Sequence, residues 1–148
     1  MRITPEQLPA QLARGLARAW LVSGDEPLRV EECVAQLRAA ARAAGHAERL
    51  ACVAESCFDW DGLAMSSQSM SLFGERRLIE LRVPTGRPGE KGAKLIEQLA
   101  EAGHDDTLLV VITGKLDKAA GASAWVSAIE SRGTHVAVRP LEAAQLPA

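Results

Sequence analysis

The sequence predicts an α/β protein with a doubly wound, mainly parallel sheet between two layers of helices. First, short apolar segments alternate with helix-period segments along the chain. Second, residues 19–22 (AWLV) and 107–113 (TLLVVIT) are continuous apolar runs, as expected of buried parallel strands. Third, the helical segments between strands are long enough for βαβ crossovers. Together these observations predict a three-layer α/β/α domain.

Five strands are predicted, at residues 19–22, 50–54, 77–83, 107–113 and 134–138. The fourth is apolar on both faces, so we expect it near the centre of the sheet. The first ends at Ser23-Gly24-Asp25, a sequence typical of a turn. The prediction is therefore a five-stranded sheet.

The first two helices are predicted from apolar spacing and end signals. Residues 5–14 place Leu8 and Leu12 on one face of a short helix. In residues 27–44, Pro27 suits the first turn and Gly45 suits the stop. The apolar residues of this longer helix recur at helical spacing, and they are Val30, Cys33, Val34, Leu37 and Ala41.

Three more helices lie between the later strands. Asp59 is a suitable N-cap for a helix that runs to about Met70. A loop rich in glycine and proline follows residue 83 and leads into the next helix. The inward-facing residues of the three helices are Trp60, Leu63 and Ala64, then Leu95, Ile96 and Leu99, then Trp125, Val126 and Ile129.

Composition predicts one ordinary globular domain. The chain has 148 residues, 47% hydrophobic and 24% charged, enough for a single core. A net charge of −2 gives no general electrostatic case for nucleic acid or a membrane surface. The polar start and the lack of a long apolar run lead us to expect a cytoplasmic protein.

Cysteine and histidine usage does not predict a metal site. Cys33, Cys52 and Cys57 form no C-x-x-C pair, and we expect them to be small buried hydrophobic residues. The three histidines are scattered, so zinc would lack its cluster of ligands.

Ligands in this fold class bind at the carboxyl ends of the strands, but the first strand exit lacks nucleotide chemistry. A phosphate cradle needs exposed backbone N–H groups and a lysine. Here Asp25 and Glu26 would repel a triphosphate. In the loop after residue 83, Lys91 precedes Gly92, and no Ser or Thr follows to hold Mg²⁺.

The remaining polar motifs are equally incomplete. Residues 114–117 (GKLD) are similar to the N-K-x-D guanine-reading motif, but glycine replaces the asparagine. The acidic pair Asp105-Asp106 falls at the amino end of its strand, away from the expected cleft. We therefore expect no catalytic residue, cofactor or metal, with a nucleotide-binding P-loop-like NTPase domain as the alternative.

Leu72 and Phe73 are two adjacent large apolar residues in a turn between a helix and a strand. Large apolar side chains are usually buried, which favours a core role. Adjacent residues point in different directions, however, and the flanks Ser69, Ser71 and Gly74 suit an exposed tip. From the residues alone, a core role and a partner-binding role both remain open.

Residues 67–73 (SQSMSLF) resemble the clamp-binding peptide of the delta subunit family of the bacterial DNA polymerase III clamp loader. That peptide has a Gln followed by a terminal Leu-Phe pair. The resemblance extends over essentially the whole chain, through ordered matches at residues 5–8, 24–28, 104–111, 115–118, 124–125 and 144–147.

The resemblance implies an AAA+/RecA-like domain that lacks a P-loop and does not bind ATP. It implies a clamp-binding domain at residues 1–139 and the start of a linker to a missing lid domain at residues 140–148. The partner would be the beta sliding clamp, whose ring the domain helps to open for loading on DNA. Missing lid and collar domains would bind the other loader subunits, and DNA would be met only within the complex.

By the same resemblance, Leu72 and Phe73 would enter an apolar pocket on the clamp. Met70 would add an adaptable contact, Gln68 would supply amide hydrogen bonds, and Arg76 would contribute nearby. Burying two such side chains is worth roughly 3–6 kcal/mol, and association costs roughly 4–15 kcal/mol. The pair would therefore need neighbouring contacts.

Direct nucleic-acid binding is a third hypothesis, through arginines such as Arg38, Arg42, Arg76, Arg77 and Arg87. The negative net charge favours a solvated face instead.

Overall fold

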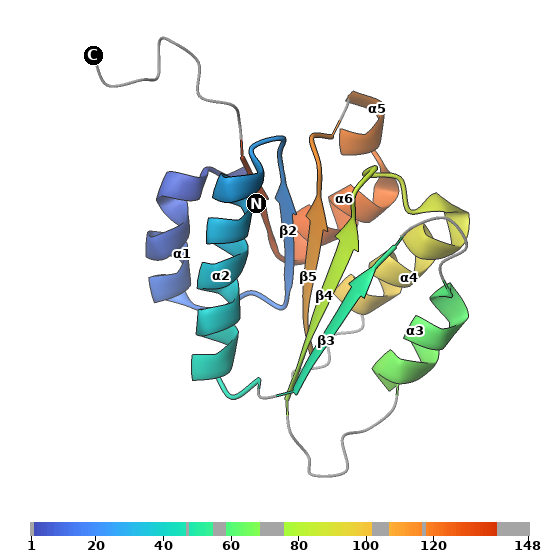
Figure 1. The fold of residues 1–148 in the computed structure, drawn as a ribbon, viewed down its shortest axis with the longest axis horizontal. Coiled ribbons are helices and arrows are strands. Elements are labelled where there is room, and N and C mark those ends of the chain that lie inside the picture. Colours follow the sequence, from blue (N-terminus) through green and yellow to red (C-terminus); the bar gives the residue numbers. More distant parts are fainter. Residues whose placement is uncertain are drawn as a thin grey trace.

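The computed structural model describes residues 2–46, 48–54, 59–68, 76–101, 107–116 and 118–138. Strands and helices alternate through most of this part of the chain (Figure 1). The strands are β1 (Arg2–Ile3), β2 (Ala19–Ser23), β3 (Glu48–Val53), β4 (Arg77–Val83), β5 (Thr107–Thr113) and β6 (Thr134–Ala137). The helices are η1 (Pro5–Gln7), α1 (Leu8–Arg14), α2 (Pro27–Ala43), α3 (Trp60–Gln68), α4 (Gly89–Glu101), α5 (Lys118–Gly121) and α6 (Ala124–Arg132).

The strands form one sheet in the order β1-β6-β2-β5-β4-β3, and each neighbouring pair is parallel. The predicted fold class is confirmed, and β5 lies in the interior of the sheet as expected. The predicted number of five strands is wrong, because β1 adds a sixth strand at the edge. This two-residue strand pairs Arg2 with His135 and is too short to show any hydrophobic period.

Helices cover both faces of the sheet, which gives the three predicted layers. Helices α1 and α2 lie on one face, and α3, α4 and α6 lie on the other (Figure 1). Alternate strand residues supply the two cores. Trp20, Val22 and Val110 face α2, whereas Leu21 and Val111 face α4 and α6.

Local signals at the helix ends explain most of the predicted boundaries. The Asp59 carboxylate accepts a hydrogen bond from the Gly62 N–H at 2.9 Å, as expected of an N-cap. Helix α2 starts at Pro27 and stops before Gly45, whose φ of 95° favours glycine. Gly133 lets α6 approach β2 closely, because an added Cβ would collide with the carbonyl oxygen of Ala19.

Across the described residues, every helix is too short or too polar to span a bilayer.

Candidate functional site

The predicted partner-binding residues belong to the segment that connects α3 to β4, here called the Leu-Phe segment (residues 68–76). Met70, Leu72 and Phe73 lie outside the described residues. Gln68 is the last residue of α3, and the structure describes its backbone but not its side chain. Arg76 is described and exposed. The structure therefore defines how the two ends of this segment are held.

Helix α3 is fixed to α4 and the sheet before the Leu-Phe segment begins. Leu63 is buried in the core shared by α3, α4 and α6. The Trp60 ring lies against Gly92 of α4, where an added Cβ would come within 2.5 Å of the ring. Lys91 of α4 pairs with Asp61 at 3.1 Å. These contacts fix the helix that leads to Gln68.

The other end of the segment is held against the end of α2. The Arg76 guanidinium donates a hydrogen bond to the carbonyl oxygen of Ala44 at 3.0 Å. Next to it, the carbonyl oxygen of Arg77 accepts a hydrogen bond from Nδ1 of the buried His46 at 3.2 Å. The start of β4 is therefore tied to the residues that end α2.

Both ends lie at the amino edge of the sheet, where α3 ends and β4 begins (Figure 1). Ligands in this fold class usually bind at the opposite, carboxyl edge. A cavity of about 400 Å³ at the amino edge is lined by Arg76, His46, Arg18 and Thr107, among others. The two described ends of the Leu-Phe segment therefore lie at the edge opposite to the one where a nucleotide would be expected.

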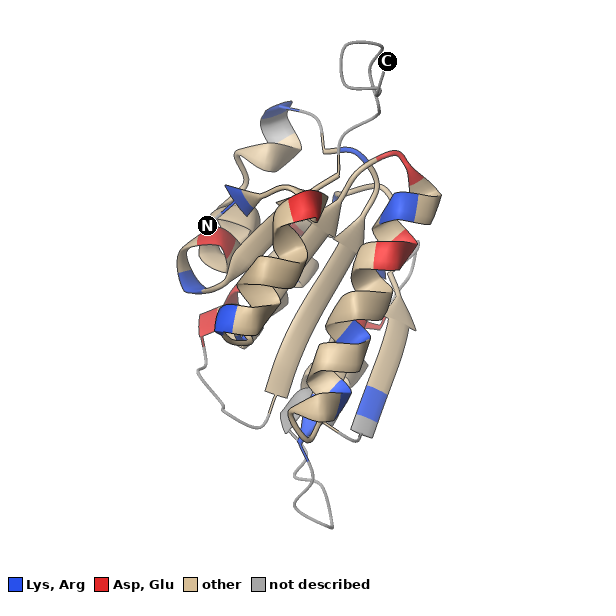
Figure 2. Ribbon diagram, turned by 90° about the vertical axis from the view of Figure 1, so that its left-hand side faces the viewer, with Lys and Arg blue, Asp and Glu red and all other residues tan. Residues whose placement is uncertain are grey.

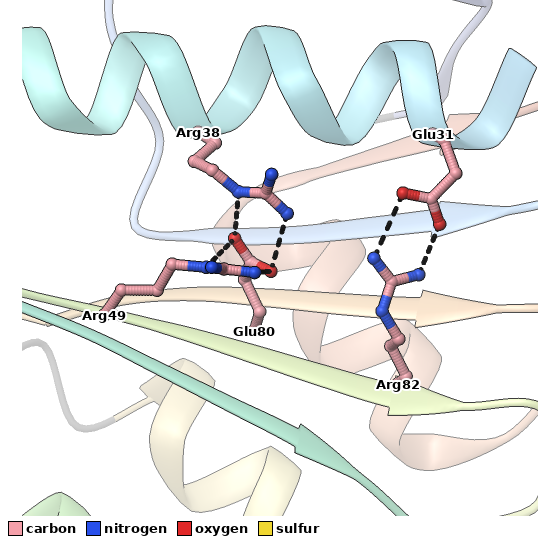
Figure 3. A network of polar contacts seen from close by, with 5 residues as sticks. All are labelled: Glu31, Arg38, Arg49, Glu80 and Arg82. Carbon is pink, nitrogen blue, oxygen red and sulfur yellow. Dashed lines mark hydrogen bonds and ion pairs between the residues drawn. The ribbon is translucent and has the colours of Figure 1, made fainter.

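A buried carboxylate beneath α2 is the strongest electrostatic feature of the described residues. Glu80 of β4 is 1% exposed. Its oxygens accept hydrogen bonds from Arg38 of α2 at 2.7 and 3.0 Å and from Arg49 of β3 at 2.9 and 2.9 Å (Figure 3). Burial alone would raise the pKa of Glu80, but the two arginines outweigh it and lower the pKa to about 2.

A second ion pair lies beside the first, where Arg82 of β4 binds both carboxylate oxygens of Glu31 on α2 (Figure 3). The two pairs join α2 to the β3–β4 end of the sheet. Sequence reasoning missed both. The signal was present in strand 77–83, where Glu80 and Arg82 interrupt an apolar pattern on one face.

The arginines considered for nucleic-acid binding include several with structural contacts. Arg38 binds Glu80, Arg76 binds a backbone carbonyl, and Arg77 is buried. Residues of both charge signs lie on the side of the molecule that carries α1 and α2 (Figure 2). This face is therefore no uniform positive surface for a polyanion.

Backbone hydrogen bonds hold the strand exit after β2 against its neighbours. The Gly24 N–H donates to the carbonyl oxygen of Gly114 at 3.3 Å, and the Val138 N–H donates to that of Ser23 at 2.7 Å. The Gly24 N–H, one backbone donor that a cradle at this exit would need, is thus used within the protein. Lys91 lies inside α4 and is paired with Asp61, so it is no phosphate-loop lysine.

Among the described residues, no group of three or more His, Cys, Asp or Glu side chains could hold a metal ion. Cys33 is buried as expected and Cys52 is half-buried, whereas Cys57, His104 and Asp105-Asp106 lie outside the described residues.

Comparisons with known proteins identify relatives along the chain. The profile of the family "DNA polymerase III, delta subunit" matches residues 20–139. The DNA polymerase III subunit delta of Escherichia coli (strain K12) is 36% identical over 147 residues, covering 99% of this chain and 43% of that protein. The subunit delta of Haemophilus influenzae is 33% identical over 124 residues, covering 84% of this chain and 36% of that protein.

The fold also matches a solved structure, that of the Bacillus subtilis DNA clamp loader delta protein, with a TM-score of 0.72 and 16% identity. The match covers 96% of this chain and 44% of that one. The chain thus spans less than half the length of the relatives that it matches. On the family profile and the two sequence relatives, the chain belongs to the DNA polymerase III delta subunit family.

Proposed function

We propose that this chain is the clamp-binding part of a clamp-loader delta subunit and that it binds the beta sliding clamp through the Leu-Phe segment. The observation that carries the proposal is the family match over residues 20–139, which includes the whole segment. In this proposal, residues 1–139 form the clamp-binding domain, and residues 140–148 begin the linker to a lid domain.

Leu72 and Phe73 act as the apolar contact of the interface, entering a pocket on the clamp. Met70 adapts to the pocket wall, and Gln68 donates and accepts amide hydrogen bonds at the start of the segment. Arg76 supplies a cation at its other end. The contacts of α3 with α4, and of Arg76 with Ala44, support this role because a segment with fixed ends loses less entropy on binding.

Ring opening requires that the domain bind the open or distorted clamp more tightly than the closed ring. A ligand with equal affinity for two states shifts neither population. Burial of Leu72 and Phe73 contributes roughly 3–6 kcal/mol of binding free energy. The entropy cost of association offsets this contribution in part or in full. Neighbouring contacts must therefore supply the difference in affinity between open and closed rings.

The domain has no catalytic activity of its own in this proposal and works as a replication accessory protein in the cytoplasm. Other loader subunits bind lid and collar domains outside this chain. The engaged backbone N–H of Gly24, and the carboxylates of Asp25 and Glu26 beside it in sequence, support the absence of ATP binding. Calorimetric titration with ATP and GTP tests this directly, and binding at micromolar affinity would favour the alternative NTPase function.

The clamp proposal is tested by the double substitution Leu72→Ala with Phe73→Ala. We expect the variant to lose clamp binding in calorimetry while its thermal unfolding stays close to that of the wild type. The control is Leu28→Ala with Val53→Ala, which trims two side chains that are 73% and 46% exposed elsewhere. The control should bind the clamp normally. Unfolding of the test variant would instead identify Leu72 and Phe73 as core residues.

A further inference from the structure

Met65 is a large apolar residue that faces water on α3, where it is 71% exposed. Two other large apolar residues are exposed in the described part of the chain, Leu28 at 73% and Val53 at 46%. Leu28 lies in the first turn of α2 and Val53 ends β3, so both lie at the carboxyl edge of the sheet. Met65 differs in its place, because α3 leads directly into the Leu-Phe segment (Figure 1).

A single exposed apolar residue is common on protein surfaces and by itself predicts no partner. The sequence after Met65 changes this, since Met70, Leu72 and Phe73 follow within a short stretch. Gln68 comes three residues after Met65, the spacing that places two helix positions on one face. Met65 is therefore the helical end of an apolar stretch of sequence and is not a solitary exposed residue.

The chain length between Met65 and Leu72 keeps the two residues within the span of one protein interface. From Met65 to Gln68 the helix rises about 4.5 Å. The four residues from Gln68 to Leu72 add at most about 14 Å, even when fully extended, so Met65 lies within about 20 Å of Leu72. A standard interface covers about 800 Å² on each partner, a patch roughly 30 Å across. One patch of that size holds both residues.

The contacts of α3 with the rest of the domain fix the side that it presents to solvent. Leu63 is buried in the core shared by α3, α4 and α6. One turn before Met65, Asp61 pairs with Lys91 of α4 at 3.1 Å, and both side chains are exposed. Protein interfaces typically combine an apolar centre with a polar rim. Met65 suits this arrangement, because the ion pair precedes it on α3 and the Leu-Phe segment follows it.

We propose that the clamp interface extends from the Leu-Phe segment onto α3, where Met65 contacts an apolar patch of the clamp beside the pocket for Leu72 and Phe73. This inference rests on the proposed function. The Leu-Phe pair alone does not exceed the cost of association, so binding needs a further apolar contact. Methionine suits this role because its unbranched, polarizable side chain adapts to a partner surface. A polar patch fits less well, since the thioether is only a weak acceptor.

The test compares Met65→Ala with the control Leu28→Ala, by calorimetric titration with the cognate clamp. Leu28 is matched in exposure and also lies on a helix, but at the carboxyl edge. We expect Met65→Ala to bind the clamp about tenfold more weakly and the control to bind like the wild type. Alanine and methionine both favour helices, so thermal unfolding of Met65→Ala should stay close to that of the wild type. Met65→Leu keeps an apolar side chain of similar volume and should retain binding.

Burial of the Met65 methyl group gives a second measurement, which a purely structural role would not change. The chain has three methionines, Met1, Met65 and Met70, so isotope labelling of methionine methyl groups gives a simple NMR spectrum. The Met65 signal is the one that is lost in Met65→Leu. A soluble nitroxide should broaden this signal in the free chain, and addition of the clamp should protect it.

Clamp binding by Met65→Ala as tight as that of Leu28→Ala would overturn the inference, as would a Met65 methyl group that stays open to nitroxide in the complex. In either case, loss of binding by the Leu72→Ala, Phe73→Ala variant would leave the clamp proposal standing. A wild-type chain that does not bind the clamp would overturn both. Protection of the methyl group in the concentrated free chain that disappears on dilution would identify a second copy of the chain as the partner, and would also overturn the inference.

Discussion

Glu80 provides the sharpest test of the energetics of this fold. Its carboxylate is 1% exposed and accepts four hydrogen bonds from Arg38 and Arg49. Lowering its pKa from 4.5 to about 2 corresponds to about 3 kcal/mol of stability at neutral pH. The side chains of Arg38 and Arg49 are 31% and 46% exposed, so water partly solvates their positive charges when the carboxylate is removed. We expect Glu80→Gln to lower the free energy of unfolding by about 2–3 kcal/mol at pH 7.

The sign of the pH dependence follows from the lowered pKa. The contribution of Glu80 is fully present above its unfolded pKa of about 4.5 and is lost as pH falls toward 2. Urea denaturation at several pH values should therefore show the wild type and Glu80→Gln converging below about pH 4. The control Glu31→Gln breaks an exposed pair with Arg82 and should cost less than about 1 kcal/mol. A Glu80→Gln variant as stable as wild type at pH 7, or a difference independent of pH, would refute this reasoning.

Two glycines that lie in close contact with neighbouring atoms give further predictions, each measured by thermal unfolding. Gly133→Ala should destabilise the protein by about 1–3 kcal/mol, because its Cβ would collide with the carbonyl oxygen of Ala19. Gly92→Ala should cost a similar amount and also weaken clamp binding, because it displaces the Trp60 ring at the start of α3. Gly121→Ala is the control for both, since its Cβ meets nothing within 4 Å. Equal melting temperatures for all three variants would contradict the packing described here.

The layer structure could be predicted from the sequence because its signals are local. Strands such as 107–113 are continuous apolar runs, and helices such as 27–44 have a regular apolar face with Pro27 and Gly45 at their ends. Strand β1 and helix α5 were missed, since elements of two and four residues are too short for a hydrophobic period to repeat. Their positions depend on pairing with β6 and on the turn after β5.

The charged network could not be predicted, because its partners are distant in sequence. Glu80 and Arg38 are 42 residues apart, and Glu80 and Arg49 are 31 apart. Only the sheet order, which places β3 beside β4 beneath α2, brings these three side chains together. A cavity of about 440 Å³ at the carboxyl edge of the sheet is non-local in the same way, since β2, β6, α5 and the turn after β5 each supply part of its wall.

Burial arguments leave the role of Leu72 and Phe73 open, because the usual burial of large apolar side chains favours a core role, whereas the small and polar flanks suit an exposed tip. These residues lie outside the described part of the structure, so their role stays a prediction. The family match is what favours the interface.

The central claim is that this chain binds the sliding clamp through the Leu-Phe segment. The most direct test is to mix the chain with its cognate clamp and measure the mass of the complex by size exclusion with light scattering. We expect a complex with the wild-type chain and none with the Leu72→Ala, Phe73→Ala variant, which should elute as a folded protein. Separate elution of the wild-type chain and the clamp would contradict the claim, as would an undiminished complex with the folded double variant.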